Sequence, residues 1–283
     1  MKDRVITGLI IAAVMIPCAV FMHTLAFPIM IAVISAFCVF EIQKATGSKN
    51  PVLIAISCVT AAAIPFLIHY SVKFAFMPVA VIYILVYLCI MVVMHGKTSF
   101  NDAVLALFST LCIPTGISMM LKLRDVYLDF PDSFTKASGV FFIIFGYISA
   151  WGCDIGANVF GRKFGKHKLA PGISPKKTVE GAVCGVLFAV VLNIILWLLF
   201  NKFWFTSHDF SLIADIAVTV ILAIISIFGD LAASIIKRNH DIKDFGKLLP
   251  GHGGMMDRFD SILFVIPAEY IAVRILMIGF KAV

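Results

Sequence analysis

Charged residues are scarce in this sequence. Only 14% of its 283 residues are Asp, Glu, Lys or Arg, whereas 61% are hydrophobic. A soluble domain of this length needs far more charged surface than that to cover its core. The scarcity argues against a soluble globular protein, and several apolar runs are long enough to cross a bilayer. The sequence therefore predicts an all-α, polytopic integral membrane protein.

Several other patterns are missing. The seven cysteines are scattered through apolar segments without a Cys-x-x-Cys or Cys/His spacing, so no thiolate metal site is expected. No apolar run alternates with a period of two residues, as the strands of a membrane barrel do. Internal repeats and low-complexity linkers are also absent. The first apolar run lacks a small-residue cleavage site, and we expect it to be a retained helix rather than a signal peptide.

Apolar windows of about 17 to 25 residues predict about nine transmembrane helices. Their approximate ranges are 5–22, 24–40, 52–70, 74–94, 103–121, 137–160, 180–205, 211–236 and 260–280. We expect two regions. Residues 1–136 would hold the first five spans, and residues 137–283 would form a catalytic region with spans six to nine and two long polar connections.

Lys and Arg are distributed unevenly over the connections between these spans. The side that bears the N-terminus carries 16 of the 23, the other side carries 6, and Arg274 lies within the last span. Cytoplasmic loops carry the excess of Lys and Arg in membrane proteins. We therefore expect a bacterial inner-membrane protein with a cytoplasmic N-terminus and an external C-terminus. Both long polar connections, 161–179 and 237–259, would face the cytoplasm, where their charge density exceeds what topology alone requires.

The first polar cluster covers residues 151–181. Asp154 and Asn158 are four residues apart, so they share one face of the sixth span. An acid at that depth needs a water-filled cavity or a partner, although Asp154 alone could equally cap a helix or form an ion pair. The following stretch GRKFGKHK predicts a flexible basic loop, and SPKKTVEG predicts a helix start with two lysines beside free N–H groups. This combination suits a chain of phosphates.

The second polar cluster runs from the eighth span to the start of the ninth. Asp230 and Ser234 share a helical face, and Lys237 and Arg238 follow at the water boundary. Asp257 and Asp260 are three residues apart where the ninth helix is expected to start, again on one face. Three carboxylates among cations near one membrane surface are typical of Mg²⁺ holding substrate phosphates. His252, in a glycine-framed turn, could donate to a phosphate or could simply be solvated.

Four polar residues lie away from these clusters, deep in the apolar spans: Asn193, Asp215, Glu269 and Arg274. We expect them to pack or to form hydrogen bonds between helices. Glu269 and Arg274 are five apart, which is unfavourable for pairing on one helix. Each could instead bind a neighbouring helix.

Residues 234 to 260 read SIIKRNHDIKDFGKLLPGHGGMMDRFD. This segment resembles the signature of the phosphatidate cytidylyltransferases: S-x-x-K-R, four residues, K-D, then P-G-H-G-G and D-R-x-D. The stretches D-I-G-A-x-x-x-G-R-x-F-G-K and I-S-P-K-K-T-x-E-G resemble the same family, except that Asn158 stands where an aromatic residue is common. The matching signature positions are Ser234, Lys237, Arg238, Lys243, Asp244, Gly246, Pro250, His252, Gly253, Gly254, Asp257, Arg258 and Asp260.

The resemblance implies a reaction of CTP with phosphatidic acid that gives CDP-diacylglycerol and pyrophosphate. It implies Mg²⁺, with a second metal ion left open, and a homodimer by family analogy. Nucleic acid is not an expected partner. We assign Asp230, Asp257 and Asp260 to the metal, with Asp154 as a further ligand or as a substrate-binding residue that supports the ligands. We assign Ser174, Lys176, Lys177 and Thr178 to the triphosphate, with Ser234 and Asn158 as further substrate-binding residues. Charge neutralisation is assigned to Lys237, Arg238, Lys243 and Arg258, and phosphate hydrogen bonding to His252.

Other functions fit parts of the sequence. A CTP-dependent polyprenol kinase, or a cytidylyltransferase for another lipid phosphate, would need similar phosphate-binding residues. A secondary transporter predicts essential acids near the bilayer midplane, whereas Asp154, Asp230, Asp257 and Asp260 gather near one face. The CDP-alcohol phosphotransferases are disfavoured because their D-G-x-x-A-R motif is absent. A structural scaffold leaves both polar clusters unexplained.

Overall fold

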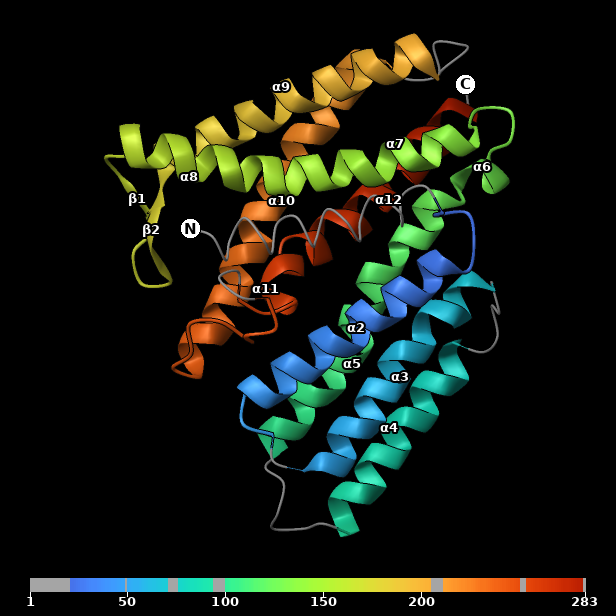
Figure 1. Cartoon of the computed structure of the whole chain (residues 1–283), viewed down its shortest axis with the longest axis vertical. Helices are drawn as coiled ribbons and strands as arrows, with labels where there is room; N and C mark the ends of the chain where they lie inside the picture. The colour runs from blue at the N-terminus through green and yellow to red at the C-terminus, as the bar shows by residue number, and fades with distance from the viewer. Residues whose placement is uncertain are drawn as a thin grey trace. The chain divides into compact units, whose positions relative to one another are not determined.

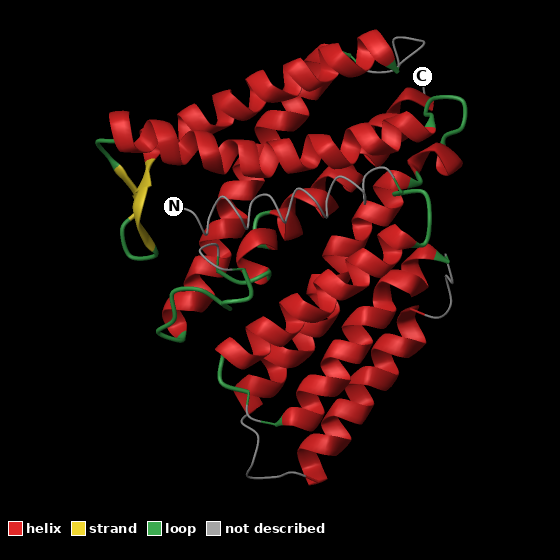
Figure 2. Ribbon diagram, in the orientation of Figure 1, coloured by secondary structure: helices red, strands yellow, loops and turns green. Residues whose placement is uncertain are grey.

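A computed structural model describes residues 21–48, 50–70, 76–93, 100–204, 211–249 and 253–281 of the chain. Helices dominate these residues, as Figures 1 and 2 show. They are α2 (Ala26–Ala45), α3 (Pro51–His69), α4 (Phe76–Val93), α5 (Phe100–Arg124), α6 (Val126–Asp129), α7 (Lys136–Tyr147), α8 (Cys153–Phe164), α9 (Val179–Phe203), α10 (Leu212–Asn239), α11 (Met256–Phe259) and α12 (Ile262–Lys281). The strands in the described part are β1 (Lys168–Ala170) and β2 (Ser174–Thr178).

The predicted all-α membrane architecture is confirmed. Six helical segments of the described chain are long and apolar enough to cross a membrane, and α4 is a shorter apolar helix. The predicted spans from 24–40 onward all fall on helices. The first predicted span, 5–22, lies almost entirely outside the described residues, so the count of nine stays a prediction. The chain is a multi-pass membrane protein.

The chain forms two compact units. Unit 1 contains residues 1–121 and 239–259, and unit 2 contains residues 122–238 and 260–283. The loop between α10 and α12 therefore belongs to unit 1, although both flanking helices are mostly in unit 2. The division into regions 1–136 and 137–283 remains a prediction about function.

Unit 1 is built from α2 to α5 and the segment that contains α11. Its core includes Leu53 from α3, Tyr83 and Tyr87 from α4, and Ala103 from α5. The buried hydroxyl of Tyr83 lies 2.9 Å from the hydroxyl of Ser57, which satisfies both groups. These apolar contacts and paired polar groups join the three helices.

Unit 2 contains one long helical run, because α7 continues through a π-helical turn at Ile148–Gly152 into α8. Helix α9 packs closely against α8 (Figure 1). Glycines allow this approach: a Cβ at Gly185 would lie 2.5 Å from the carbonyl oxygen of Cys153, and a Cβ at Gly156 2.7 Å from Phe188 Cβ. Close packing at small residues is typical of helix association in membranes.

Two of the four polar residues expected to contact neighbouring elements, Asn193 and Arg274, do so in unit 2. The Asn193 amide donates to Ser149 Oγ at 2.9 Å and to Thr219 Oγ1 at 3.1 Å, which links α9 to its two neighbours. The Arg274 guanidinium donates to Asp129 Oδ2 at 2.6 Å, so its partner lies outside α12. Both contacts match the expectation of partners on neighbouring elements.

The connection after α8 is more ordered than its sequence suggests. Helix α8 continues to Phe164, with Arg162 and Lys163 in its last turn, where cations are favourable beside the helix dipole. The segment that follows forms an antiparallel hairpin of β1 and β2, which the sequence did not predict. The predicted helix start is confirmed: Thr178 Oγ1 accepts from the Gly181 N–H at 3.2 Å and caps α9.

Glu180 holds the start of this hairpin. Its carboxylate accepts from the backbone N–H of Lys166 at 3.0 Å and from that of His167 at 3.2 Å. The His167 ring nitrogen Nδ1 lies 2.5 Å from Glu180 Oε1. The hairpin and the first turn of α9 are thereby connected, which fixes the strand that carries Lys176 and Lys177.

Candidate active site

Lys177 and Asp230 form an ion pair within unit 2. Lys177 belongs to β2 and Asp230 to α10, and each side chain is about three-quarters buried. The sequence predicts that Lys177 binds the nucleotide and that Asp230 binds a metal ion. The structure brings these two residues into contact, so a phosphate or metal that reached either side chain would meet both.

A second lysine and carboxylate lie nearby on unit 2. Lys237 Nζ is 3.9 Å from Asp260 Oδ2, and the two side chains are only 11% and 10% exposed. Burial above all, together with the charges of Asp230 and Asp154, raises the pKa of the Asp260 carboxyl to about 7, and Lys237 opposes the rise. An ionised Asp260 therefore needs additional positive charge close to it.

Asp154 completes this group of carboxylates. Its Oδ2 accepts from Ser261 Oγ at 3.3 Å, and Ser261 donates its backbone N–H to Asp260 Oδ1 at 2.8 Å. Asp154 comes from α8, Asp230 from α10 and Asp260 from the turn before α12. Three elements distant in sequence thus place three acids and two lysines together, and we call these five residues the carboxylate cluster.

The carboxylate cluster suits a hard cation in its chemistry, because carboxylate oxygens are the preferred ligands of Mg²⁺. Among the described residues, however, no three Asp, Glu, His or Cys side chains approach closely enough to enclose a metal ion. A metal held here would take only part of its ligands from the protein. Mg²⁺ in nucleotide enzymes often takes the others from substrate phosphates and water.

Asp257 lies in unit 1, in the short helix α11. Its Oδ2 accepts the backbone N–H of Phe245 at 2.8 Å and that of Gly254 at 3.0 Å. Asp260 follows in the turn after α11, so the ninth helix does not run continuously through both acids as expected. The carboxylate of Asp257 therefore fixes the loop that contains the family-like signature.

Glu41 is a residue that sequence analysis missed. It lies near the end of α2, is 6% exposed, and accepts the backbone N–H of Met256 at 2.9 Å through Oε2. A Cβ at Gly246 or Gly254 would overlap its carboxylate, so the signature has glycine at both positions where Glu41 approaches. An acid inside an apolar span is energetically unfavourable unless it has a partner. The presence of Glu41 in an apolar segment was therefore a sequence signal that could have identified it.

Known proteins resemble this chain over much of its length. The chain matches the cytidylyltransferase family over residues 2–276. The chain belongs to the cytidylyltransferase family. It is 36% identical to a phosphatidate cytidylyltransferase of Staphylococcus saprophyticus over 176 residues, which is 62% of this chain and 61% of that protein. Proteins of the same name from Staphylococcus haemolyticus and Staphylococcus aureus are 35% and 34% identical over the same shares of both chains.

The other predicted site residues of this cytidylyltransferase-family member fall at several places. Ser234 is buried one turn after Asp230 on α10, and Arg238 donates to the carbonyl oxygen of Ile173 at 3.4 Å. His252 lies outside the described residues. The remaining residues are half-buried or exposed on α8, β2, α11 or the 239–249 segment: Asn158, Ser174, Lys176, Lys243 and Arg258.

Proposed function

We propose that this protein transfers the cytidylyl group of CTP to phosphatidic acid, giving CDP-diacylglycerol and pyrophosphate. The names of its relatives support the reaction, although the alignments span about 61% of each relative's length. The observation that carries the proposal is the carboxylate cluster, in which Asp154, Asp230 and Asp260 face Lys177 and Lys237. With a divalent cation bound to its acids, such a cluster suits two polyanionic substrates that must be brought together.

The proposed step is an in-line displacement. A phosphate oxygen of phosphatidic acid forms a bond to the α-phosphorus of CTP, and the bond from that phosphorus to the oxygen bridging to the β-phosphate breaks. Pyrophosphate leaves with the electron pair of that bond. The lipid phosphate is already ionised near neutral pH, so the step requires positioning and charge neutralisation more than a strong base.

The residues of the carboxylate cluster, and others predicted to bind substrate, would have different roles in this step. Lys177, with Ser174 and Lys176 on the same strand, would bind the triphosphate, and Lys237 would stabilise charge on the departing pyrophosphate. Arg238, Lys243 and Arg258 would add positive charge. Thr178 would contribute through the α9 cap that it forms. When bound, Mg²⁺ would withdraw charge from the phosphate oxygens, held by Asp230 and Asp260 with Asp154 and Asp257 as further candidates.

We also propose the orientation and assembly that the sequence predicts: a bacterial inner-membrane protein with a cytoplasmic active site, working as a homodimer. Single cysteines at Lys166 and Lys247, in a background without the native cysteines, test the orientation. Both positions are exposed. An impermeant thiol reagent should label them only when the cytoplasmic face is open, and should label a cysteine at the exposed Asp132 from outside. The reverse pattern would contradict the proposal.

The activity is tested with purified protein, phosphatidic acid, Mg²⁺ and CTP that is radiolabelled at either the α- or the γ-phosphate. Cytidylyl transfer should place the α-label, and none of the γ-label, in the lipid fraction. Transfer of the γ-label would identify a lipid kinase instead. No label in the lipid with either nucleotide would contradict both activities.

A further inference from the structure

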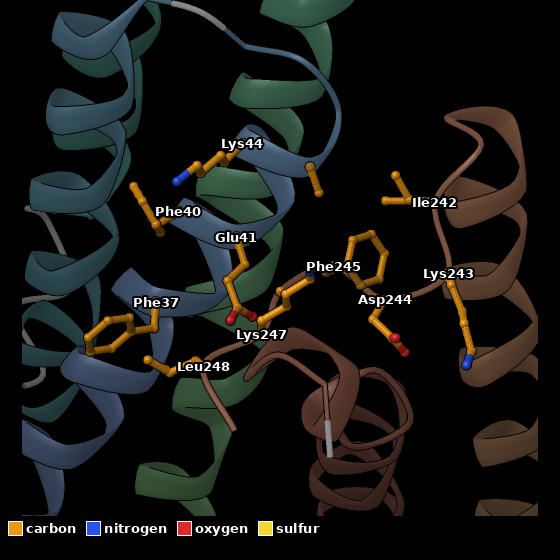
Figure 3. A pocket seen from close by; sticks show the side chains of 12 residues that line it. Phe37, Phe40, Glu41, Lys44, Ile242, Lys243, Asp244, Phe245, Lys247 and Leu248 are labelled. Carbon is orange, nitrogen blue, oxygen red and sulfur yellow. The ribbon is translucent and has the colours of Figure 1, made fainter. Parts of the chain in front are cut away.

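A cavity of about 550 Å³ lies within unit 1, between the end of α2 and the segment 242–248. Figure 3 shows Phe37, Phe40, Glu41 and Lys44 projecting from α2 on one side of it. Residues 242–248 form the other side. The volume is within the range of small-molecule sites, and Lys243 is the one lining residue to which the proposed reaction has already assigned a role.

The cavity is amphipathic. Phe37, Phe40 and Leu248 are exposed apolar side chains on its wall. Three exposed lysines also line it, namely Lys44, Lys243 and Lys247, together with the exposed acid Asp244. The ligand that fits both kinds of lining is an anion with an apolar portion.

An apolar stripe on α2 leads to this cavity. Leu25, Ile29, Val33 and Phe37 follow one another at four-residue spacing and are all exposed. Residues at this spacing lie on one helical face, and α2 is one of the helices that can cross the membrane. The stripe is suited to contact acyl chains, and it ends at the lysine-lined cavity, because Phe37 also lines the cavity and Lys44 follows two turns later.

We propose that this cavity binds the phosphate headgroup and glycerol of an anionic lipid whose acyl chains lie along the α2 stripe. This inference rests on the proposed function, because it assigns the cavity to the lipid substrate. Lys44 and Lys247 bind the phosphate, and Phe37 and Phe40 contact the start of the chains. A nucleotide has no apolar tail to cover the two phenylalanines, which is why the lipid is the favoured source of the phosphate.

The walls of the cavity are held in place by contacts already described. Glu41, in its lining, binds the backbone of Met256, and the buried Phe245 donates its backbone N–H to Asp257. The lysines are thus presented on a fixed loop and a fixed helix. Lys44 Nζ also lies 5.4 Å from the centre of the Phe40 ring, which places cation and apolar wall next to each other.

The test is photo-crosslinking of the full-length protein in lipid nanodiscs, without CTP, using phosphatidic acid with a diazirine in its acyl chain. Mass spectrometry should find the label on α2 between residues 25 and 40. The double variant Lys44→Ala/Lys247→Ala should reduce labelling by about thirtyfold, on the basis of the usual attraction per lysine near a membrane surface. Lys44→Arg/Lys247→Arg should retain it.

Lys202 supplies a matched control, because its Nζ lies 5.3 Å from the Phe203 ring in the same manner and it does not line the cavity. Lys202→Ala should leave labelling unchanged. Phosphatidylcholine carrying the same diazirine should label α2 weakly and without dependence on Lys44. Labelling of other helices, or equal labelling by both lipids, would overturn the proposal.

Two further measurements are needed. One distinguishes a lipid phosphate from a soluble phosphate, and the other distinguishes failure of the lipid site from failure of the proposed function. If inorganic phosphate or CTP at millimolar concentration prevents labelling, the cavity is a soluble-phosphate site and the lipid assignment fails. Normal cytidylyl transfer with an unchanged KM for phosphatidic acid in the Lys44→Ala/Lys247→Ala variant overturns the lipid site alone. Lysine-dependent labelling in a protein that transfers no cytidylyl group overturns the proposed function alone.

Discussion

Glu41 Oε2 accepts a 2.9 Å hydrogen bond from the backbone N–H of Met256, 215 positions further along the chain. This bond connects the membrane helix α2 to the loop that carries the family-like signature, within one compact unit. The same carboxylate occupies the space that side chains at positions 246 and 254 would need. Helix α2 therefore supports the signature directly, which gives it a role besides spanning the membrane.

Gly254→Ala should destabilise the loop, because the added Cβ overlaps the Glu41 carboxylate. We expect a cost of about 1–3 kcal/mol, as for other overpacked sites, seen as a lower melting temperature in detergent and lower cytidylyl transfer. Gly172→Ala is the control, since an added Cβ there meets no atom within 4 Å. Equal melting temperatures and equal cytidylyl transfer in the two variants would show that the added Cβ at position 254 does not clash with Glu41.

The same clash predicts coupling between the two positions. Glu41→Ala removes the overlap but also leaves the Met256 N–H without its acceptor, so it should be destabilising alone. Gly254→Ala added to Glu41→Ala should cost little more, because the obstructing carboxylate is gone. Additive losses in this double-mutant cycle would show that the two residues act independently.

Lys177→Ala and Lys176→Ala should differ although the residues are adjacent. Lys177 pairs with Asp230 and is largely buried, whereas Lys176 is exposed on the same strand. We expect kcat/KM for CTP to fall roughly 10- to 100-fold for Lys177→Ala, as when a contact between charged groups is lost, and only a few-fold for Lys176→Ala. Equal losses in steady-state kinetics would remove the special role of Lys177.

Asp260→Asn should lower turnover about 100-fold or more even at saturating CTP. The substitution preserves size but removes the charge that would help to hold Mg²⁺ beside the leaving pyrophosphate. Asp132→Asn, at an exposed turn, is the control and should be silent. The comparison requires kinetics over a grid of CTP and Mg²⁺ concentrations. Near-normal turnover would exclude Asp260 from the catalytic cluster.

Asp257 has an observed role in the loop and a predicted role as a metal ligand, and substitutions can separate the two. Its Oδ2 accepts two backbone N–H groups, and Asp257→Asn keeps a carbonyl oxygen that can accept both. We expect this variant to melt like the wild type and to lose turnover, as the predicted metal ligand requires. Asp257→Ala should lose both. If Asp257→Asn retains full activity, Asp257 only supports the loop.

Local sequence determined much of this protein. Hydropathy located the helices from α2 onward, because the cost of placing polar residues in hydrocarbon depends on each segment's own composition. The start of α9 at Thr178 was also predictable, since a cap is formed within one turn. Acids at the ends of apolar spans indicated Asp154, Asp230 and Asp260, which the structure brings together.

Only the tertiary structure decided which of these groups are partners. Lys177 with Asp230, Arg274 with Asp129 and Glu41 with Met256 are pairs between elements distant in sequence. No local pattern encodes such pairs, because they depend on how the helices pack and on which buried groups must share a hydrogen bond or a counter-charge. For the same reason Gly254 was recognisable as part of a motif, whereas the carboxylate that requires a glycine there became evident only when α2 and the signature loop were seen in contact.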